Sequence, residues 1–371
     1  MTVMTPTPAR IHAFDWLRGL AVVVMLQTHA LVLLNEAATK TPLFRWLVRL
    51  DGLVAPSFIF SAGFALALVQ VRAAAAGRLA AQARKSLSRA LEVLLVASVI
   101  NASWFPVWRE PKWFLRIDIL HCIGLSLLAV LPLLVALANR PAVLRVVTLL
   151  MALVIFAVSP FAESVTGPWS VLLNTRPGAL DATTATTFAL FPWSGYVFLG
   201  ASFGTTVGSM QRERQLWAWL GLLLGLGALL WWQEDALRAA YPKHDFWVTN
   251  PANAAQRWTL VLSLVTVLRL VEVRWPSSVR SRLAQLVGTF GASSLSAYFF
   301  HQLLLYQRHV GVFTRFWRGQ ADFPLYAVLV GALVAATWVC VKGWERLEPK
   351  WRSRLPGGRA TSSATPPRPA S

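Results

Sequence analysis

The sequence has 371 residues, of which 56% are hydrophobic and only 14% are charged, and its formal net charge is +19. A soluble domain carries about a quarter charged residues, so this composition excludes an ordinary soluble protein and predicts an integral membrane protein. The basic residues lie in connections and tails between apolar blocks rather than among aromatic residues on a polar surface. The positive charge therefore favours membrane topology over nucleic-acid binding.

Apolar blocks of about twenty residues, the length that crosses a bilayer as a helix, recur along the chain. We predict an all-α fold, with one polytopic transmembrane bundle of about ten spans in residues 14–345. A cytoplasmic tail (1–13) precedes it, and a basic, disordered cytoplasmic tail (346–371) follows it. The predicted spans are 15–34, 52–71, 87–105, 116–138, 142–160, 188–208, 216–232, 258–273, 285–306 and 323–343.

Lysine and arginine gather in the even-numbered connections between these spans and in the C-terminal tail. Because such residues are retained on the cytoplasmic side, both termini are predicted to be cytoplasmic. The connections 161–187 and 233–257 then lie outside, and connections of this length often carry function. Glycines spaced by four, at Gly200, Gly204 and Gly208 and at Gly221 and Gly225, predict close helix packing.

The first predicted span contains a histidine at a depth where ionisable residues are rare. His29 lies within the apolar run that begins at Leu20, and ten residues separate it from Arg18. At the rise of a helix this spacing is about 16 Å, which is close to half a bilayer. An ionisable side chain inside a membrane is costly and is usually functional, so His29 is the leading candidate for a catalytic role.

Other ionisable residues fall at a similar depth in the outer half of the bilayer under this topology. They are Asp51, Arg116, Asp118, His121 and His301. Such a layer is tolerated when its members pair or line a wet cavity. Structural roles stay open for each: Arg18 as a cytoplasmic anchor, the two aspartates as helix caps, Arg116 as a partner of Asp118, and the histidines as core residues.

The chemistry suited to this layer is acyl transfer. A neutral imidazole takes a proton from a hydroxyl or amine, or attacks a thioester itself, and a carboxylate can orient the ring. No G-x-S-x-G elbow, P-loop or H-E-x-x-H motif is present. Cys122 and Cys340 form no CxxC pair and no Cys/His ligand spacing, so no metal site is predicted.

Five segments in order then resemble a known family. RIHAFDWLRGLAVVVMLQTHA in the first span resembles the signature of the heparan-α-glucosaminide N-acetyltransferase-like integral-membrane acyltransferases and their bacterial relatives. LDGLVAPSFIFSAGFALAL, LRIDILHCIGLSLL, FPWSGYVFLGASFG and LSAYFFHQLLLY agree with it. The resemblance covers most of residues 10–345 and implies a multi-pass protein of the bacterial inner membrane.

The resemblance also implies a reaction: an acyl group, expected to be acetyl, moves from cytoplasmic acetyl-CoA to a hydroxyl or amine of an extracytoplasmic sugar or glycan. In the eukaryotic heparan enzyme the active histidine lies in the loop between the first two spans. The corresponding loop here, NEAATKTPLFRWLVRLDG, has no histidine. The catalytic assignment therefore moves to His29 in the first span.

The resemblance and the polar layer together give a set of expected site residues. The expected catalytic residues are His29, Asp118 and His301; the expected CoA-binding residues are Arg18 and Arg116; the expected acceptor-binding residues are Asp51, His121 and Trp193. Membrane lipids and a second copy in a homodimer are the other expected partners.

A different class of function uses the same residues. In a transporter or carrier of a small polar or lipid-linked solute, the polar layer would be a permeation path. Many transporters are built from inverted repeats with paired broken spans, and the sequence has neither. The sequence leaves open which acceptor is used, whether oxygen or nitrogen is acylated, and whether an acyl-enzyme forms.

Overall fold

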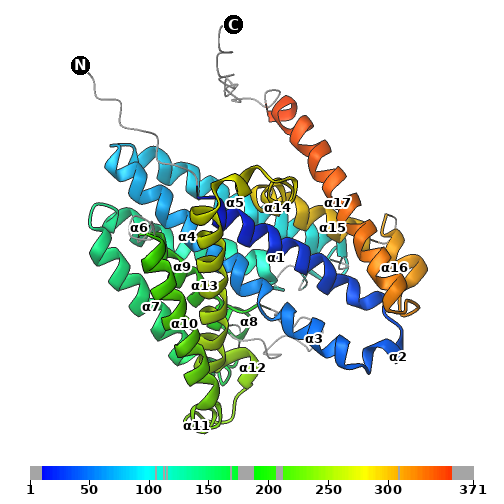
Figure 1. The fold of residues 1–371 in the computed structure, drawn as a ribbon, viewed down its shortest axis with the longest axis horizontal. Coiled ribbons are helices and arrows are strands. Elements are labelled where there is room, and N and C mark those ends of the chain that lie inside the picture. Colours follow the sequence, from blue (N-terminus) through cyan, green and yellow to red (C-terminus); the bar gives the residue numbers. More distant parts are fainter. Residues whose placement is uncertain are drawn as a thin grey trace, which may run out of the picture.

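The computed structural model describes residues 11–104, 107–111, 113, 116–167, 169–173, 188–205, 212–307 and 310–352. Every regular element among these residues is a helix, and the only strand-like pairing among them is an isolated bridge between Leu34 and Ala321. The predicted all-α class is therefore confirmed (Figure 1).

The helices run in the following order along the described chain. They are α1 (His12–Ala30), η1 (Leu31–Leu33), α2 (Glu36–Thr39), α3 (Pro42–Asp51), α4 (Val54–Ala75), α5 (Leu79–Trp104), α6 (Ile119–Leu137), α7 (Pro141–Ala162), α8 (Ser170–Leu173), α9 (Leu190–Gly204), α10 (Glu213–Trp232), α11 (Glu234–Ala239), α12 (Phe246–Thr249), α13 (Pro251–Arg274), η5 (Pro276–Arg280), α14 (Arg282–Ala292), α15 (Ser294–Tyr306), α16 (Val312–Trp317) and α17 (Phe323–Arg352).

Eight helical segments in the described part of the chain are long and apolar enough to cross a membrane. Two other predicted spans fall on α9, which has 15 residues, and on α14 and α15, which are separated at Ser293. The multi-pass helical architecture is confirmed, and the count of ten stays a prediction. Helix α17 continues past the predicted boundary at residue 345, and residues 1–10 and 353–371 lie outside the described residues.

Helix α1 occupies the middle of the bundle. It contacts α4, α13, α14, α15 and α17, and Figure 1 shows it crossing the centre of the molecule between them. Side chains on several faces of the helix are buried as a result, and Leu17, Val22 and Leu26 are completely buried. Side chains on different faces of this one helix therefore meet different neighbours, and this arrangement allows α1 to contribute to more than one cavity.

Both ends of α1 are fixed by polar contacts. At its start, the backbone N–H groups of His12 and Ala13 donate to the carboxylate of Glu272 on α13, at 2.9 and 3.2 Å. These donors have no partner within their own helix, so Glu272 caps α1. Near its end, the Tyr326 hydroxyl of α17 donates to the carbonyl oxygen of Gln27 at 2.8 Å.

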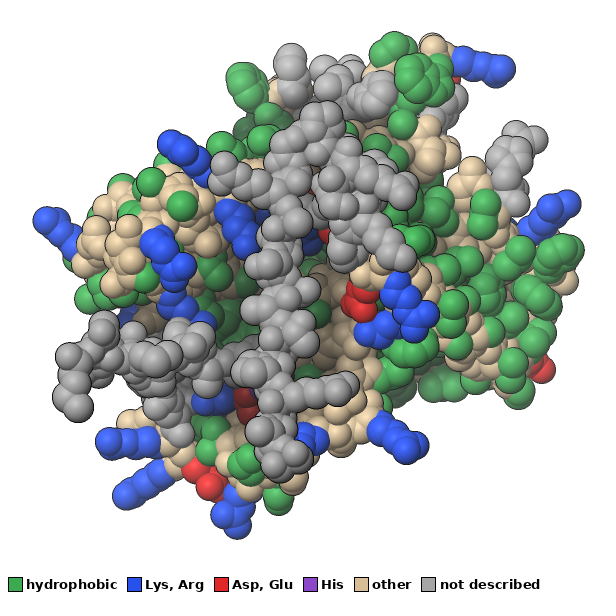
Figure 2. Space-filling model, turned by 90° about the horizontal axis from the view of Figure 1, so that it is seen from above, with side chains coloured by type: hydrophobic (Ala, Val, Ile, Leu, Met, Phe, Trp, Pro, Cys, Tyr) green, Lys and Arg blue, Asp and Glu red, His purple; other side chains and the backbone are tan. Residues whose placement is uncertain are grey.

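The end of the bundle at which α1 begins and α17 ends is rich in cations. Figure 2 views the molecule from this end and shows Lys and Arg side chains around the rim of the face. The connection between α4 and α5 lies here and contributes Arg78. We call this end the basic end.

Close approach between helix backbones occurs where glycine removes the side chain. A Cβ atom on Gly19 of α1 would lie 1.9 Å from the carbonyl oxygen of Val287 on α14. A Cβ on Gly63 of α4 would lie 2.0 Å from the carbonyl oxygen of Val197 on α9. Real Cβ atoms do not approach this closely, so these crossings require glycine.

The glycine pattern read from the sequence is only partly correct. Gly200 and Gly204 of α9 do face α4, where a Cβ would lie 2.0 Å from the oxygen of Phe60 and 2.5 Å from that of Phe64. A Cβ on Gly221 or Gly225 of α10 would meet no atom of another helix within 4 Å, so both glycines face open space. The prediction of close packing was therefore wrong for Gly221 and Gly225, although α10 packs against α13 through other residues. Gly208 lies outside the described residues.

The connection predicted at 233–257 is shorter in the structure, because α13 begins at Pro251; its residues 233–250 are ordered and pack on the end of α7. It contains α11 and α12, and the buried carboxylate of Glu163 accepts hydrogen bonds from the Asp245 N–H at 3.0 Å and from the Thr249 hydroxyl. Most of the other long connection, 161–187, lies outside the described residues.

A matched pair of substitutions tests the glycine packing. Gly63→Ala places a methyl group against the Val197 carbonyl and should destabilise the fold by about 1–3 kcal/mol, because the two backbones must separate. Gly221→Ala enters open space and should leave stability unchanged or slightly raised, because alanine favours helix. Thermal unfolding of the detergent-purified variants measures both, and an equal loss in the two would contradict the packing.

Candidate functional site

Two cavities adjoin each other beside α1. The first has a volume of about 320 Å³ and is lined by side chains of α1, α4, α5, α6 and α15, among them three cations. The second has a volume of about 280 Å³ and includes His29 in its wall. We call them the cation cavity and the histidine cavity. Met25, Ile119 and Tyr298 line both, so the two spaces share one wall.

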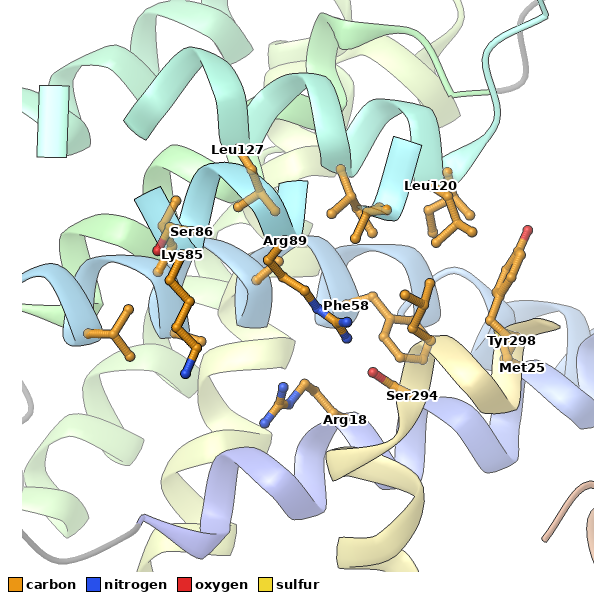
Figure 3. A pocket seen from close by; sticks show the side chains of 18 of the residues that line it. Arg18, Met25, Phe58, Lys85, Ser86, Arg89, Leu120, Leu127, Ser294 and Tyr298 are labelled. Atoms are coloured by element: carbon orange, nitrogen blue, oxygen red, sulfur yellow. The ribbon is translucent and has the colours of Figure 1, made fainter. Parts of the chain in front are cut away.

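The cation cavity lies toward the basic end. Figure 3 shows Arg18, Lys85 and Arg89 with their nitrogen atoms turned into the same space. Arg18 comes from α1, and the other two lie one turn apart on α5. None of the described residues that line this cavity is acidic. The cavity therefore favours an anionic ligand.

The three cationic side chains differ in whether they already form ion pairs with acidic residues. The Arg18 guanidinium bonds Asp15 at 2.5 Å, and its Nε makes no hydrogen bond within the described part of the chain. Arg89 pairs with Glu92 at 2.8 Å. Lys85 is exposed and has no ion pair among the described residues. Lys85 is therefore the cation most available to a ligand.

Lys85 and Arg89 were not among the expected site residues. The sequence pattern indicated only a basic connection that sets topology. Their spacing of four, with Gln82 and Ser86 on the same face of α5, is the signal that would have found them. All four residues line the cation cavity.

The histidine cavity brings together four of the expected residues. His29 from α1, Asp51 from α3, and Arg116 and Asp118 before α6 all line it. Thr28, Asn101 and Gln302 add further polar groups, and Trp104 and Phe188 add aromatic surface. A cavity lined in this way suits a polar ligand that also presents an apolar face.

The hydrogen bonds of His29 define which ring nitrogen is basic. The Tyr306 hydroxyl donates its proton to the His29 carbonyl oxygen at 2.9 Å, and its oxygen lies 3.3 Å from His29 Nδ1. Since the hydroxyl has only one proton, Nδ1–H is the donor in the second contact. The lone pair is then on Nε2 of His29, as a general base requires.

His301 lies behind His29 and outside both cavity linings. It is completely buried, its Nδ1 lies 3.0 Å from the Ala297 carbonyl, and the two imidazole centroids are 5.1 Å apart. A carbonyl only accepts, so Nδ1 carries the proton, and Nε2 has no hydrogen-bond partner among the described residues. His301 is thus placed to support His29 and not to contact a ligand in either cavity.

Asp118 both caps a helix and lines the histidine cavity. Its carboxylate accepts from the backbone N–H groups of Leu120 and His121, at 3.0 and 3.1 Å, and from His121 Nδ1 at 2.9 Å. The capping role left open by the sequence is therefore present. The histidine that Asp118 orients is His121, which is buried and lines neither cavity.

Asp51 does not cap the helix that follows it. It is the last residue of α3, the N-cap of α4 is Leu53, and the Asp51 carboxylate accepts a hydrogen bond from the Thr28 hydroxyl at 2.5 Å. Thr28 is adjacent to His29 in α1. This hydrogen bond therefore links the end of α3 to the residue that precedes His29.

The remaining expected residues take different places. Arg116, which was expected to bind CoA, lines the histidine cavity and not the cation cavity. Its carbonyl accepts from the Asn101 side chain at 2.8 Å. Trp193 on α9 is buried and lines neither cavity, but its ring packs edge-on at 5.0 Å against Phe188, which does. The Arg257 guanidinium lies 5.9 Å from the centroid of the Trp193 ring.

The fold and the site define a polytopic membrane protein with a cationic cavity and a histidine cavity side by side in one helical bundle. Residues 10–232 match the family described as heparan-alpha-glucosaminide N-acetyltransferase, catalytic. The match covers more than half of the chain, so the protein belongs to this family, as the resemblance implied. A comparison with curated proteins finds no match.

Family membership indicates a membrane acetyltransferase-like function. The matched range includes α1 to α10 and thus Arg18, His29 and Lys85. Helix α15, which supplies Tyr298 and Tyr306, lies beyond it. Among the described residues, no group of three or more His, Cys, Asp or Glu side chains is arranged to hold a metal ion.

The cap of α6 can be tested without an activity assay. Asp118→Ala removes the cap and should destabilise the fold by about 1 kcal/mol for that contact, with a further loss because His121 loses its buried partner. Asp118→Asn keeps an oxygen that accepts from the backbone and should retain most of the stability. The unfolding temperature in detergent compares the two, and equal losses would mean that the charge matters and the cap does not.

Proposed function

We propose that the protein transfers an acyl group, acetyl in the first instance, from acyl-CoA in the cation cavity to a hydroxyl or amine in the histidine cavity. The observation that carries the proposal is that the two cavities lie side by side and share three lining residues. A donor bound by the cations of one cavity would then have its thioester end next to the base and the acceptor in the other. Family membership supports the acetyl donor, because the family is one of acetyltransferases.

The cation cavity fits the donor by charge and by length. Coenzyme A carries phosphates, and charge-assisted bonds from Arg and Lys to phosphate are among the stronger polar contacts. Arg18 and Lys85 would hold these phosphates at the mouth of the cavity. The interval from Arg18 to His29 along α1 is about 16 Å, which is of the order of the pantetheine arm.

The positive-inside rule gives the orientation. The cation cavity lies toward the basic end, and Lys and Arg favour the cytoplasmic side. The donor then enters from the cytoplasm, both termini are cytoplasmic, and the histidine cavity faces the opposite side of the inner membrane. The acceptor would be an extracytoplasmic sugar or glycan.

In the proposed step, His29 Nε2 takes the proton of the acceptor hydroxyl or amine. The acceptor atom attacks the thioester carbonyl, a C–O or C–N bond forms, and the C–S bond breaks. The leaving thiolate then receives the proton from His29, which restores the neutral ring. Tyr306 acts as a positioning residue because its contacts hold the ring and define which nitrogen is basic. His301 supports the ring only by packing beside it, with centroids 5.1 Å apart.

The acceptor has a matching set of contacts in the histidine cavity. Asp51, Arg116 and Gln302 present polar groups to its hydroxyls. Trp104 and Phe188 offer flat apolar surfaces for the face of a sugar ring. His121 and Trp193 contribute from behind this lining, through Asp118 and Phe188 respectively.

Replacing the proposed base tests the mechanism. His29→Ala should lower the rate of acyl transfer by roughly 100-fold to 10,000-fold, the usual contribution of a general base, while the protein remains folded in the membrane. His12→Ala is the matched control, because His12 lies at the start of the same helix and outside both cavities.

The assay is transfer of radiolabelled acetyl from acetyl-CoA to a panel of sugars and glycans by purified protein in detergent or liposomes. Near-normal transfer by His29→Ala would remove the histidine from the mechanism. Solute movement across liposomes without consumption of acetyl-CoA would support the transporter class instead.

The donor site is tested by a second matched pair. Lys85→Gln removes a cation that lines the cation cavity and should raise the KM for acetyl-CoA roughly tenfold, as expected for one charge-assisted contact. Turnover should change little, because the contact is made in the ground state as well as the transition state. Arg84→Gln is the control, since the adjacent Arg84 lines neither cavity; equal effects on KM would indicate a general loss of charge.

A further inference from the structure

Three residues line both cavities and form the wall between them: Met25 of α1, Ile119 of α6 and Tyr298 of α15. We call this wall the neck, because a donor that reaches His29 from the cation cavity must pass between these side chains. Met25 and Ile119 are buried, with 3% and 9% of their surfaces exposed. Figure 3 shows Met25 and Tyr298 at the end of the cation cavity opposite Lys85. The neck is therefore apolar on at least two sides and lies deep in the bundle.

The position of the neck on α1 gives it a role in the path of the donor. Met25 lies seven residues after Arg18 and four residues before His29, which correspond to about 10 Å and about 6 Å along the helix. Residues four apart share a helical face. A thioester that reaches His29 from the cation cavity therefore passes Met25, and its acyl group passes before the pantetheine arm.

We propose that this neck selects acyl groups by their width, and that Met25 is the residue that determines the limit. The inference rests on the proposed function. A straight acyl chain extends the pantetheine arm without widening it, whereas a methyl branch beside the thioester carbonyl widens the part that must enter first. The neck passes acetyl and other unbranched groups and retards branched ones.

The three side chains of the neck differ in conformational flexibility. Ile119 is β-branched and therefore stiff at χ1, and it begins α6 directly after the Asp118 cap. The Tyr298 ring packs against His301 with centroids 5.2 Å apart. Met25 is unbranched and flexible. Shortening Met25 consequently widens the neck while the opposite walls stay in place.

The test compares two donors with the same number of carbon atoms. Butyryl-CoA is straight and isobutyryl-CoA is branched beside the carbonyl, so their ratio of kcat/KM reports width and not size. For the wild type we expect a ratio of roughly tenfold or more, because one misplaced methyl group in a fitted apolar site changes kcat/KM by roughly 10- to 200-fold. For Met25→Ala the ratio should fall below about threefold, mainly through faster isobutyryl transfer, because the wider neck no longer penalises the branch.

Met151→Ala is the matched control. Met151 is an exposed methionine on α7 that lines neither cavity, so the same substitution there should keep the wild-type ratio. Ile119→Val removes a single methyl group from the opposite wall and gives a second, milder way to widen the neck if Met25→Ala folds poorly. Its ratio should lie between those of the wild type and Met25→Ala.

The outcomes separate this inference from the function on which it rests. A wild type that transfers acetyl but treats butyryl and isobutyryl donors alike would overturn selection at the neck and leave the acyltransferase intact. An unchanged ratio in both Met25→Ala and Ile119→Val would do the same. No transfer from any acyl-CoA by the wild type would overturn the function and the inference together.

Discussion

The site depends on how closely α1 can approach its neighbours. At Gly19 the backbone of α1 lies against the Val287 carbonyl of α14, with no space for even a methyl group. Gly291 of α14 makes the reciprocal contact with the Asp15 carbonyl. In lipid, helices associate through close packing and polar contacts and not through a hydrophobic driving force. These crossings therefore position the helix that carries both Arg18 and His29.

The cost of burying an imidazole explains the surroundings of His29. A polar group inside a membrane bundle needs partners, and Tyr306 satisfies both the His29 ring and its carbonyl oxygen. The same contacts hold the ring in one orientation with Nε2 unprotonated. The contacts that stabilise the buried imidazole are thus the same contacts that a general base needs, because a base requires a fixed ring with one unprotonated nitrogen.

The sequence predicted those parts of the site that are chemically unusual in a membrane. His29, Asp51, Arg116 and Asp118 stand out as ionisable groups in apolar surroundings, and they line one cavity. Lys85 was not recognised, because a lysine near a helix end is ordinary in a membrane protein and only its neighbours in space make it distinctive. Glycine spacing was equally ambiguous, because a spacing of four occurs both at the contact of α9 with α4 and at Gly221 and Gly225, which face open space.

Glu272 has a consequence for how the polypeptide can be divided. The stretch that matches the family ends at residue 232, yet the carboxylate that receives the first amides of α1 comes from α13. The glycine partner of α1 is on α14, and the hydroxyl that holds the His29 ring is on α15. Truncation after α10 would therefore leave the central helix without its cap, the neighbour at its glycine crossing and the partner of the His29 ring.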